Sequence, residues 1–193
     1  MGMGRAYAIL VVLLSSSLAG CSGGQTGGSD SSTSDFEVPI WETGDWWLYT
    51  FSTPDYSDDT ARLVVASTSE EDGAAYMLAI SSLTEARRHA VLNHNPFLGR
   101  MTHSELGAFE NGVAQSVLSF PLEEDKEWSF TLFSREWNAF VSDISGSSAV
   151  IIATSSDGSR LDYVFDREAG FFYSFTWKDE MGETNLRMML SDS

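Results

Sequence analysis

Cysteine is nearly absent from this chain of 193 residues, which contains Cys21 alone. A single thiol forms no internal disulfide, and once it is modified nothing remains for thiolate catalysis or for a cysteine-ligated metal. Lysine is almost as rare: the chain has Lys126 and Lys178, compared with nine arginines and 28 acidic residues. The formal net charge of −17 removes the electrostatic attraction on which nucleic-acid binding depends. The composition therefore argues against nucleic acid as a partner.

Long apolar runs are also missing, except near the N-terminus. Residues 6–14 form an unbroken apolar stretch after a short segment with one positive charge, Arg5. This order of charge, apolar run and small residues is typical of a secretory signal peptide. The run is far shorter than the roughly 20 residues that a membrane-spanning helix needs. We therefore expect residues 1–20 to be a signal peptide that is removed.

The apolar run leads into the tetrapeptide Leu18-Ala19-Gly20-Cys21. These four residues resemble the lipobox of bacterial-type membrane lipoproteins. The resemblance implies cleavage before Cys21, lipidation of its sulfur, and a protein held at the cell membrane facing outside the cytoplasm. Two acyl chains anchor a protein stably, whereas a single chain does so only marginally. The alternative interpretation is an incidental or buried thiol.

Residues 22–35 contain only Ser, Gly, Thr, Gln and Asp, so they have no side chains that build a core. Such a flexible linker has an end-to-end distance of roughly 20 Å. We expect a lipid-anchored linker over residues 21–36 and a single β-rich domain over residues 37–193.

Without Arg5 the mature chain has ten basic and 28 acidic side chains, a net charge of −18. Such a surface suits high salt, where screening is strong, or simply belongs to an acidic envelope protein.

The C-terminal half predicts six antiparallel strands that share one apolar face. The hairpin signal Asp157-Gly158 pairs Thr154 with Leu161, Ile152 with Tyr163 and Val150 with Phe165. Turns ending at Gly170 and Gly182 extend these rows to Trp177, Phe175, Tyr173 and then to Leu186, Met188, Leu190. Turns at Ser145-Gly146 and Ser134-Arg135 add Val141, Ala139, Trp137 and then Trp128, Phe130, Leu132. A slip of one residue would turn a strand's apolar set outward.

Further strands are predicted upstream, over residues 45–52, 61–67, 75–80 and 113–120, with a hairpin signal at Asn111-Gly112. Between them, a capping box at residues 82–85 and the stop Asn95-Pro96 predict one short helix. The predicted fold is all-β, or β with one short helix. We expect a long antiparallel meander curled into a half-barrel or a partly open barrel, because a sheet of this length curls.

The clearest candidate for chemistry is a basic segment. Hydrolase and phosphate-loop motifs are missing, but every histidine lies in one stretch with three arginines: Arg87, Arg88, His89, His94, Arg100 and His103. This stretch is compatible with a site for an anionic headgroup, a carboxylate or a protein partner, or with a three-histidine metal site. The histidine spacings match no helical metal motif. The alternative is a polar helix and loop whose charges offset nearby carboxylates.

A second candidate is a set of aromatic residues on the predicted apolar face: Trp128, Trp137, Tyr163, Tyr173, Phe175 and Trp177. These side chains line an apolar ligand cavity or form the core. A domain of this size must bury apolar surface against its sheet, which favours the core.

The anchored, curled sheet as a whole resembles the half-barrel envelope lipoproteins of uncharacterised or lipid-carrier type. Phe120-Pro121-Leu122 followed by Lys126-Glu127-Trp128 is similar to a segment of uncharacterised envelope lipoproteins. The segment likeness implies no activity. The lipobox, the curled apolar sheet and the missing catalytic motifs together predict a non-enzymatic binding or scaffold module without a cofactor, for an apolar small molecule or an envelope protein. The alternative is a metal-dependent or hydrolytic envelope enzyme that uses His89, His94 and His103.

Replacing Cys21 tests the anchor. We expect Cys21→Ser to leave the protein unlipidated, because the thioether needs the sulfur atom. Intact-mass measurement and detergent-phase partitioning of the membrane fraction check this result. Lipid that is still attached in the variant would contradict the lipobox interpretation.

Overall fold

The computed structural model describes residues 36–54, 56–69, 75–81 and 95–193. Within these ranges the chain is all-β, which confirms the predicted fold class. The strands are β1 (Trp46–Thr53), β2 (Tyr56–Ser69), β3 (Ala75–Ile80), β4 (Gly99–Thr102), β5 (Ala108–Glu110), β6 (Val113–Gln115), β7 (Glu127–Leu132), β8 (Arg135–Ser145), β9 (Ser148–Ser155), β10 (Arg160–Asp166), β11 (Phe171–Lys178) and β12 (Thr184–Asp192). The expected helix, over residues 82–94, lies outside the described residues. The ranges above contain no helix that could span a membrane.

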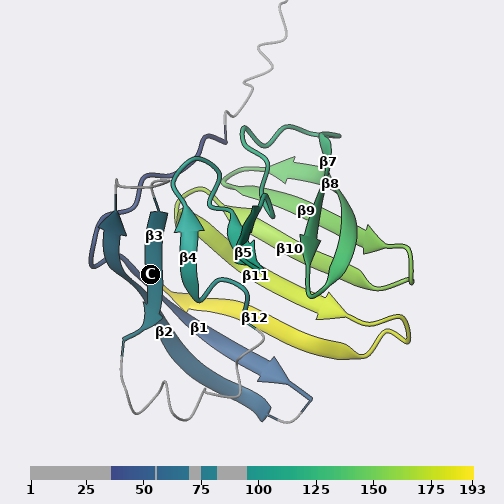
Figure 1. Ribbon diagram of the computed structural model, residues 1–193, viewed down its shortest axis with the longest axis horizontal. Coiled ribbons are helices and arrows are strands. Elements are labelled where there is room, and N and C mark those ends of the chain that lie inside the picture. The colour runs from purple at the N-terminus through teal and green to yellow at the C-terminus, as the bar shows by residue number, and fades with distance from the viewer. Residues whose placement is uncertain (1–35, 55, 70–74, 82–94) are drawn as a thin grey trace, which may run out of the picture. The chain divides into compact units, whose positions relative to one another are not determined.

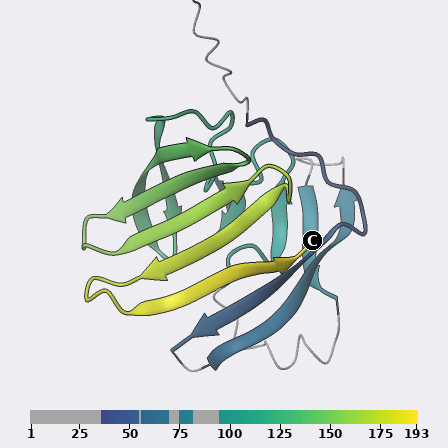
Figure 2. The same ribbon diagram turned by 180° about the vertical axis from the view of Figure 1, so that it is seen from behind.

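The strands form one antiparallel sheet of twelve strands, in the order β6-β5-β4-β3-β2-β1-β12-β11-β10-β9-β8-β7. The pairing of β1 with β12 joins the two ends of the domain. The sheet curls into a nearly closed barrel (Figure 1), which confirms the predicted curled, partly open barrel. The strand order leaves β6 and β7 at its free edges. Figure 2 shows the continuous wall from the green β9 through the yellow β12 to the blue β1 and β2. We call the break in backbone pairing between β6 and β7 the seam.

The predicted register is confirmed at the middle of the C-terminal strands. Leu161 pairs with Trp177 and Tyr163 pairs with Phe175. Phe175 in turn pairs with Met188. All of these except Trp177, which is partly buried, are buried. The predicted hairpin at Asn111-Gly112 is also present, since both residues have positive φ and Glu110 pairs with Val113.

The predicted register of β9 is wrong by one residue. Thr154 pairs with Arg160 and Ser155 N–H donates to Ser159 O at 3.0 Å, so the connection is a three-residue loop over 156–158 rather than a two-residue turn. As a result, the buried set is Ala149, Ile151 and Ala153, and Val150, Ile152 and Thr154 face outward. The pairing with β8 shifts too, because Ala139 lies opposite Ala153, and a β-bulge follows Val141. Residues 150–152 are all apolar and β-branched, so alternation alone does not set the register here.

Two further register predictions need correction. The β7–β8 turn is Phe133-Ser134 rather than Ser134-Arg135, because Leu132 pairs with Arg135. Both turn residues have positive φ, 54° and 58°, as a type I′ turn requires. In β10–β11, a bulge pairs Phe165 with Phe172 instead of Tyr173. Tyr173 is consequently 48% exposed.

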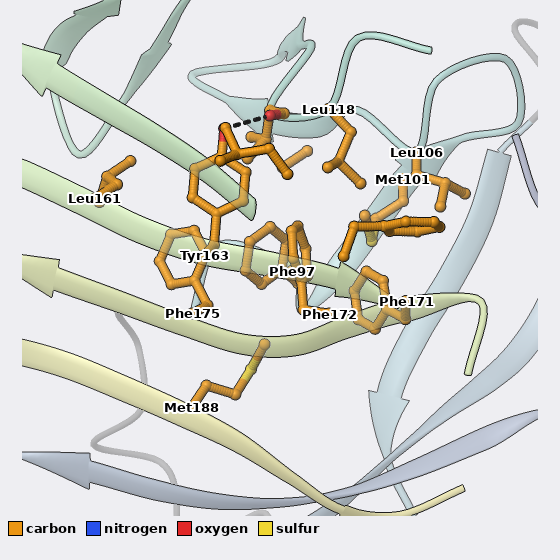
Figure 3. Close-up of a cluster of buried hydrophobic side chains, with 14 of the residues drawn as sticks. Phe97, Met101, Leu106, Leu118, Leu161, Tyr163, Phe171, Phe172, Phe175 and Met188 are labelled. Atoms are coloured by element: carbon orange, nitrogen blue, oxygen red, sulfur yellow. Dashed lines mark hydrogen bonds between the residues drawn. The ribbon is translucent and has the colours of Figure 1, made fainter. Parts of the chain in front are cut away.

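The barrel interior is filled by aromatic rings (Figure 3). The Phe97 ring lies 4.6 Å from that of Phe172 and 5.1 Å from that of Phe175, and Tyr163 lies 5.5 Å from Phe175. The Tyr163 hydroxyl donates to Val117 O at 2.8 Å, and the Tyr49 hydroxyl donates to Phe172 O at 2.6 Å. Burial raises the pKa of both tyrosines well above the usual value. The rings are therefore packed with their polar groups satisfied.

Two neighbouring substitutions test this packing. Phe175→Ala should lower the free energy of unfolding by roughly 3–5 kcal/mol, because it empties a fully buried ring position. Thr176→Ala, on the outer face beside it, should lower that free energy by only about 0.5 kcal/mol. Denaturant midpoints at the salt concentration where the wild type is most stable measure both effects. Equal losses would contradict the observed register.

Candidate functional site

A groove of about 530 Å³ lies where the N-terminal segment passes the β10–β11 turn. We call it the N-terminal groove. One wall comes from residues 39–47 and the other from the turn at residues 167–170. Its lining residues are Pro39, Ile40, Trp41, Gly44, Asp45, Trp46, Trp47, Arg167, Glu168, Ala169, Gly170 and Ser193. Its volume falls in the range of small-molecule pockets, roughly 300–1,000 Å³.

Two tryptophans hold the walls together. Trp41 Nε1 donates to Gly170 O at 3.0 Å, and Trp47 Nε1 donates to Ala169 O at 2.7 Å. Gly170 has a φ of +66°, and a Cβ there would lie 3.6 Å from Pro39. Glycine is therefore favoured here by the left-handed turn, whereas the distance to Pro39 is an ordinary contact that leaves room for a Cβ. The two indole hydrogen bonds set the width of the groove.

Asp166 organises the β10–β11 turn. Its Oδ1 accepts hydrogen bonds from the backbone N–H groups of Glu168 and Ala169, both at 2.9 Å. Its Oδ2 accepts from the Ser147 hydroxyl at 2.8 Å. Partial burial by itself would raise the pKa of Asp166, but these hydrogen bonds hold it below its ordinary value. The ionised carboxylate thus fixes the turn whose carbonyls receive Trp41 and Trp47.

Behind the groove lies an aromatic cluster that gives the N-terminal wall a rigid support. The Trp41 ring lies 4.8 Å from Trp47, 4.9 Å from Tyr76 and 5.0 Å from Phe171. The Trp41 N–H donates to the Tyr76 hydroxyl at 3.1 Å. On its other side, Tyr76 contacts the His103 ring at 4.1 Å. The predicted residue His103 is therefore linked to the groove through Tyr76.

The groove mixes one protruding apolar side chain with charges of both signs. Ile40 is 88% exposed. The carboxylates are Asp45 and Glu168, and the cation is Arg167. Arg62 covers the Trp46 ring at 4.3 Å, a cation–π contact that holds the indole in place. Such a lining suits the recognition of an amphipathic partner.

The structure does not bring the predicted basic segment together as a described site. Arg87, Arg88, His89 and His94 lie outside the described residues. Arg100 covers the Phe109 ring at 4.6 Å on the outer surface, whereas His103 packs on Tyr76. In the part of the chain that the structure describes, no three His, Cys, Asp or Glu side chains are close enough to hold a metal ion.

The predicted aromatic set divides into three groups. Trp137, Tyr163 and Phe175 are buried in the barrel. Trp128 and Trp177 are partly buried and pack against that core. The Trp177 ring is stacked on Phe133 at 4.0 Å with an interplanar angle of 7°. Tyr173 lies on the outer surface, because the bulge turns it away.

Sequence reasoning did not find the N-terminal groove. Its walls are far apart in the chain, since the Trp41–Gly170 hydrogen bond spans 129 residues. Local turn and strand signals do not report such a contact. The one available signal was the density of tryptophans at positions 41, 46 and 47.

Asp166 makes the stability of this turn depend on pH. A carboxyl whose pKa is lowered in the folded state stabilises the protein above its unfolded pKa, about 3.9, and loses this effect as the pH falls through the folded pKa. Asp166→Asn should therefore lower the free energy of unfolding by about 1 kcal/mol at neutral pH. The difference from wild type should shrink below about pH 4.

Urea titrations from neutral to acidic pH measure this difference. Ser147→Ala, which removes one of the hydrogen bonds, should show a smaller change in the same direction. A difference that grows on acidification would show that Asp166 is not held ionised by the turn.

Comparison with known proteins assigns no ligand or activity to this chain. No family model, no curated protein and no solved structure matches it. The interpretation of the groove therefore depends on its geometry.

Proposed function

We propose that this protein is an extracytoplasmic lipoprotein, anchored through Cys21, that acts as a non-enzymatic binding or scaffold module. The lipobox Leu18-Ala19-Gly20-Cys21 supports the anchor. The observation that carries the binding role is the N-terminal groove, a concave site of about 530 Å³ whose walls are joined by two indole hydrogen bonds. Preformed sites of this kind bind ligands without the cost of ordering a loop.

The interior of the barrel is packed with side chains, so we propose a binding site on the outer surface. Phe97, Phe172 and Phe175 lie in mutual ring contact and are fully buried. A ligand at their position would have to displace rings whose removal costs several kcal/mol, about 3–5 for one Phe. The N-terminal groove has no such occupant. Its rim also carries Ile40, whose side chain gains most from being covered.

The lining and the net charge restrict the partner. An apolar anchor point at Ile40 beside Asp45, Glu168 and Arg167 fits a partner that presents an apolar group flanked by polar or charged groups. The formal charge of −17 repels acidic surfaces and steers positively charged ones. Residues 39–47 follow the anchor linker in the sequence, so a lipid anchor would keep the groove within reach of other envelope components. An envelope protein is the partner class that we favour.

Site-specific photo-crosslinking tests the groove as a binding site. The photoreactive residue p-benzoyl-phenylalanine replaces Ile40 in one variant and Met181 in a matched control. Met181 is also highly exposed, at 79%, but lies in the β11–β12 turn at the other end of β11. After illumination of native envelopes, we expect a discrete adduct from position 40 and none from position 181.

A charge-reversal substitution in the groove tests whether the adduct depends on binding there. Glu168→Lys, introduced beside the probe at position 40, should reduce the yield of the adduct about tenfold, equivalent to about 1.4 kcal/mol of binding free energy. Adducts of equal yield from both probe positions, or none from position 40, would contradict the proposal.

A further inference from the structure

The seam is bridged by side chains instead of a backbone ladder. Thr131 N–H of β7 donates to the Gln115 side-chain carbonyl at 2.7 Å. Trp128 Nε1 donates to Ser116 O at 2.9 Å. Within the described residues, β6 and β7 are the two ends of the sheet and do not pair with each other. The Gln115 amide therefore takes the place that a neighbouring strand's carbonyl would occupy.

Part of the β7 edge remains free. Backbone groups alternate between the two sides of a strand, and the Thr131 N–H points toward the seam. Glu127 and Ser129 therefore direct their own N–H and C=O groups the same way. Both residues are exposed, and no backbone partner for them lies among the described residues. An edge of this kind is a template for a further strand.

The charges around the seam indicate which kind of strand would add to the β7 edge. Glu110 accepts a hydrogen bond from Ser134 N–H, in the turn after β7, at 2.8 Å, and Glu105 accepts one from the Ser116 hydroxyl. Glu123, Glu124 and Asp125 precede β7 in the chain, and Glu127 is its first residue. The nearby cations are fewer than these carboxylates, and each already has a partner. Lys126 Nζ donates to Pro121 O at 2.9 Å, Arg135 pairs with Asp157 at 2.7 Å, and Arg100 covers Phe109. The edge therefore presents a negative potential that an extended cationic segment complements.

We propose that the seam is a docking site for an extended, basic polypeptide strand. The strand adds to β7 through the backbone groups of Ser129 and Glu127 and competes with the Gln115 side chain for Thr131 N–H. Its cationic side chains lie toward the flanking carboxylates. This site is separate from the N-terminal groove, and it does not depend on the function proposed above.

The probe is a fluorescent peptide of about six residues, the usual length of a strand, with lysine and valine in alternation. Two matched peptides serve as controls. One has N-methyl groups on alternate amides, which keep the charge but prevent strand pairing, and the other has glutamate in place of lysine. Fluorescence anisotropy with the purified full chain measures each dissociation constant. We expect the unmodified basic peptide to bind at least about tenfold more tightly than either control, the equivalent of one or two hydrogen bonds.

Variants of the chain locate the peptide. Ser129→Pro removes the edge N–H, a change that edge strands tolerate, and should weaken binding about tenfold. Gln115→Leu removes the competing carbonyl and should strengthen binding about threefold. Ile40→Asp, in the groove, should leave the affinity unchanged.

The comparison between peptides does not depend on any variant folding well. Equal affinity for the methylated and unmethylated basic peptides would overturn the proposal, because binding would then depend on charge alone. Loss of binding in Ile40→Asp with no change in Ser129→Pro would also overturn it, since the peptide would then occupy the groove.

Discussion

The pairing of β1 with β12 is the constraint on which the rest of this structure depends. It joins the two ends of the domain into one sheet, and the register places Phe51 beside Met188. Because β1 is held there, Trp47 reaches the β10–β11 turn and donates to Ala169 O. The same closure leaves β6 and β7 as the remaining edges. The N-terminal groove and the seam are thus two consequences of one long-range pairing.

Packing and electrostatics act in opposite directions in this domain. A formal charge of −17 favours expansion through self-repulsion, whereas the buried rings favour compaction. The interior contributes no charge to this repulsion. Among the described residues, the buried polar side chains are Asn95 and Ser159, and both are uncharged. Charges are confined to the surface, where salt screens them. The surface is therefore free to be strongly acidic without disturbing the core, and this acidity is what both proposed binding sites would use to select a partner.

The structure agrees with the predictions from sequence where a feature depends on neighbouring residues, and differs from them where it depends on distant ones. Asn111-Gly112 predicts its hairpin because the turn conformation depends on those two residues. Phe175 and Met188 are placed correctly because their strands alternate clearly between apolar and polar positions. The prediction fails in β9, where Val150, Ile151 and Ile152 offer two apolar faces and a three-residue loop replaces the expected two-residue turn. It fails again at Tyr173, because a bulge depends on packing within the whole sheet.

The sequence by itself determined the strand-rich class, the acidic surface, the hairpin at Asn111-Gly112 and the inward faces of β10 and β12, because each depends on neighbouring residues or on composition. Only the tertiary structure decided the closure of β1 on β12, the contact of Trp41 and Trp47 with the turn after Asp166, and the position of His103 behind Tyr76. These contacts join residues more than twenty positions apart. Their stability comes from the summed packing of the barrel, which no local pattern encodes.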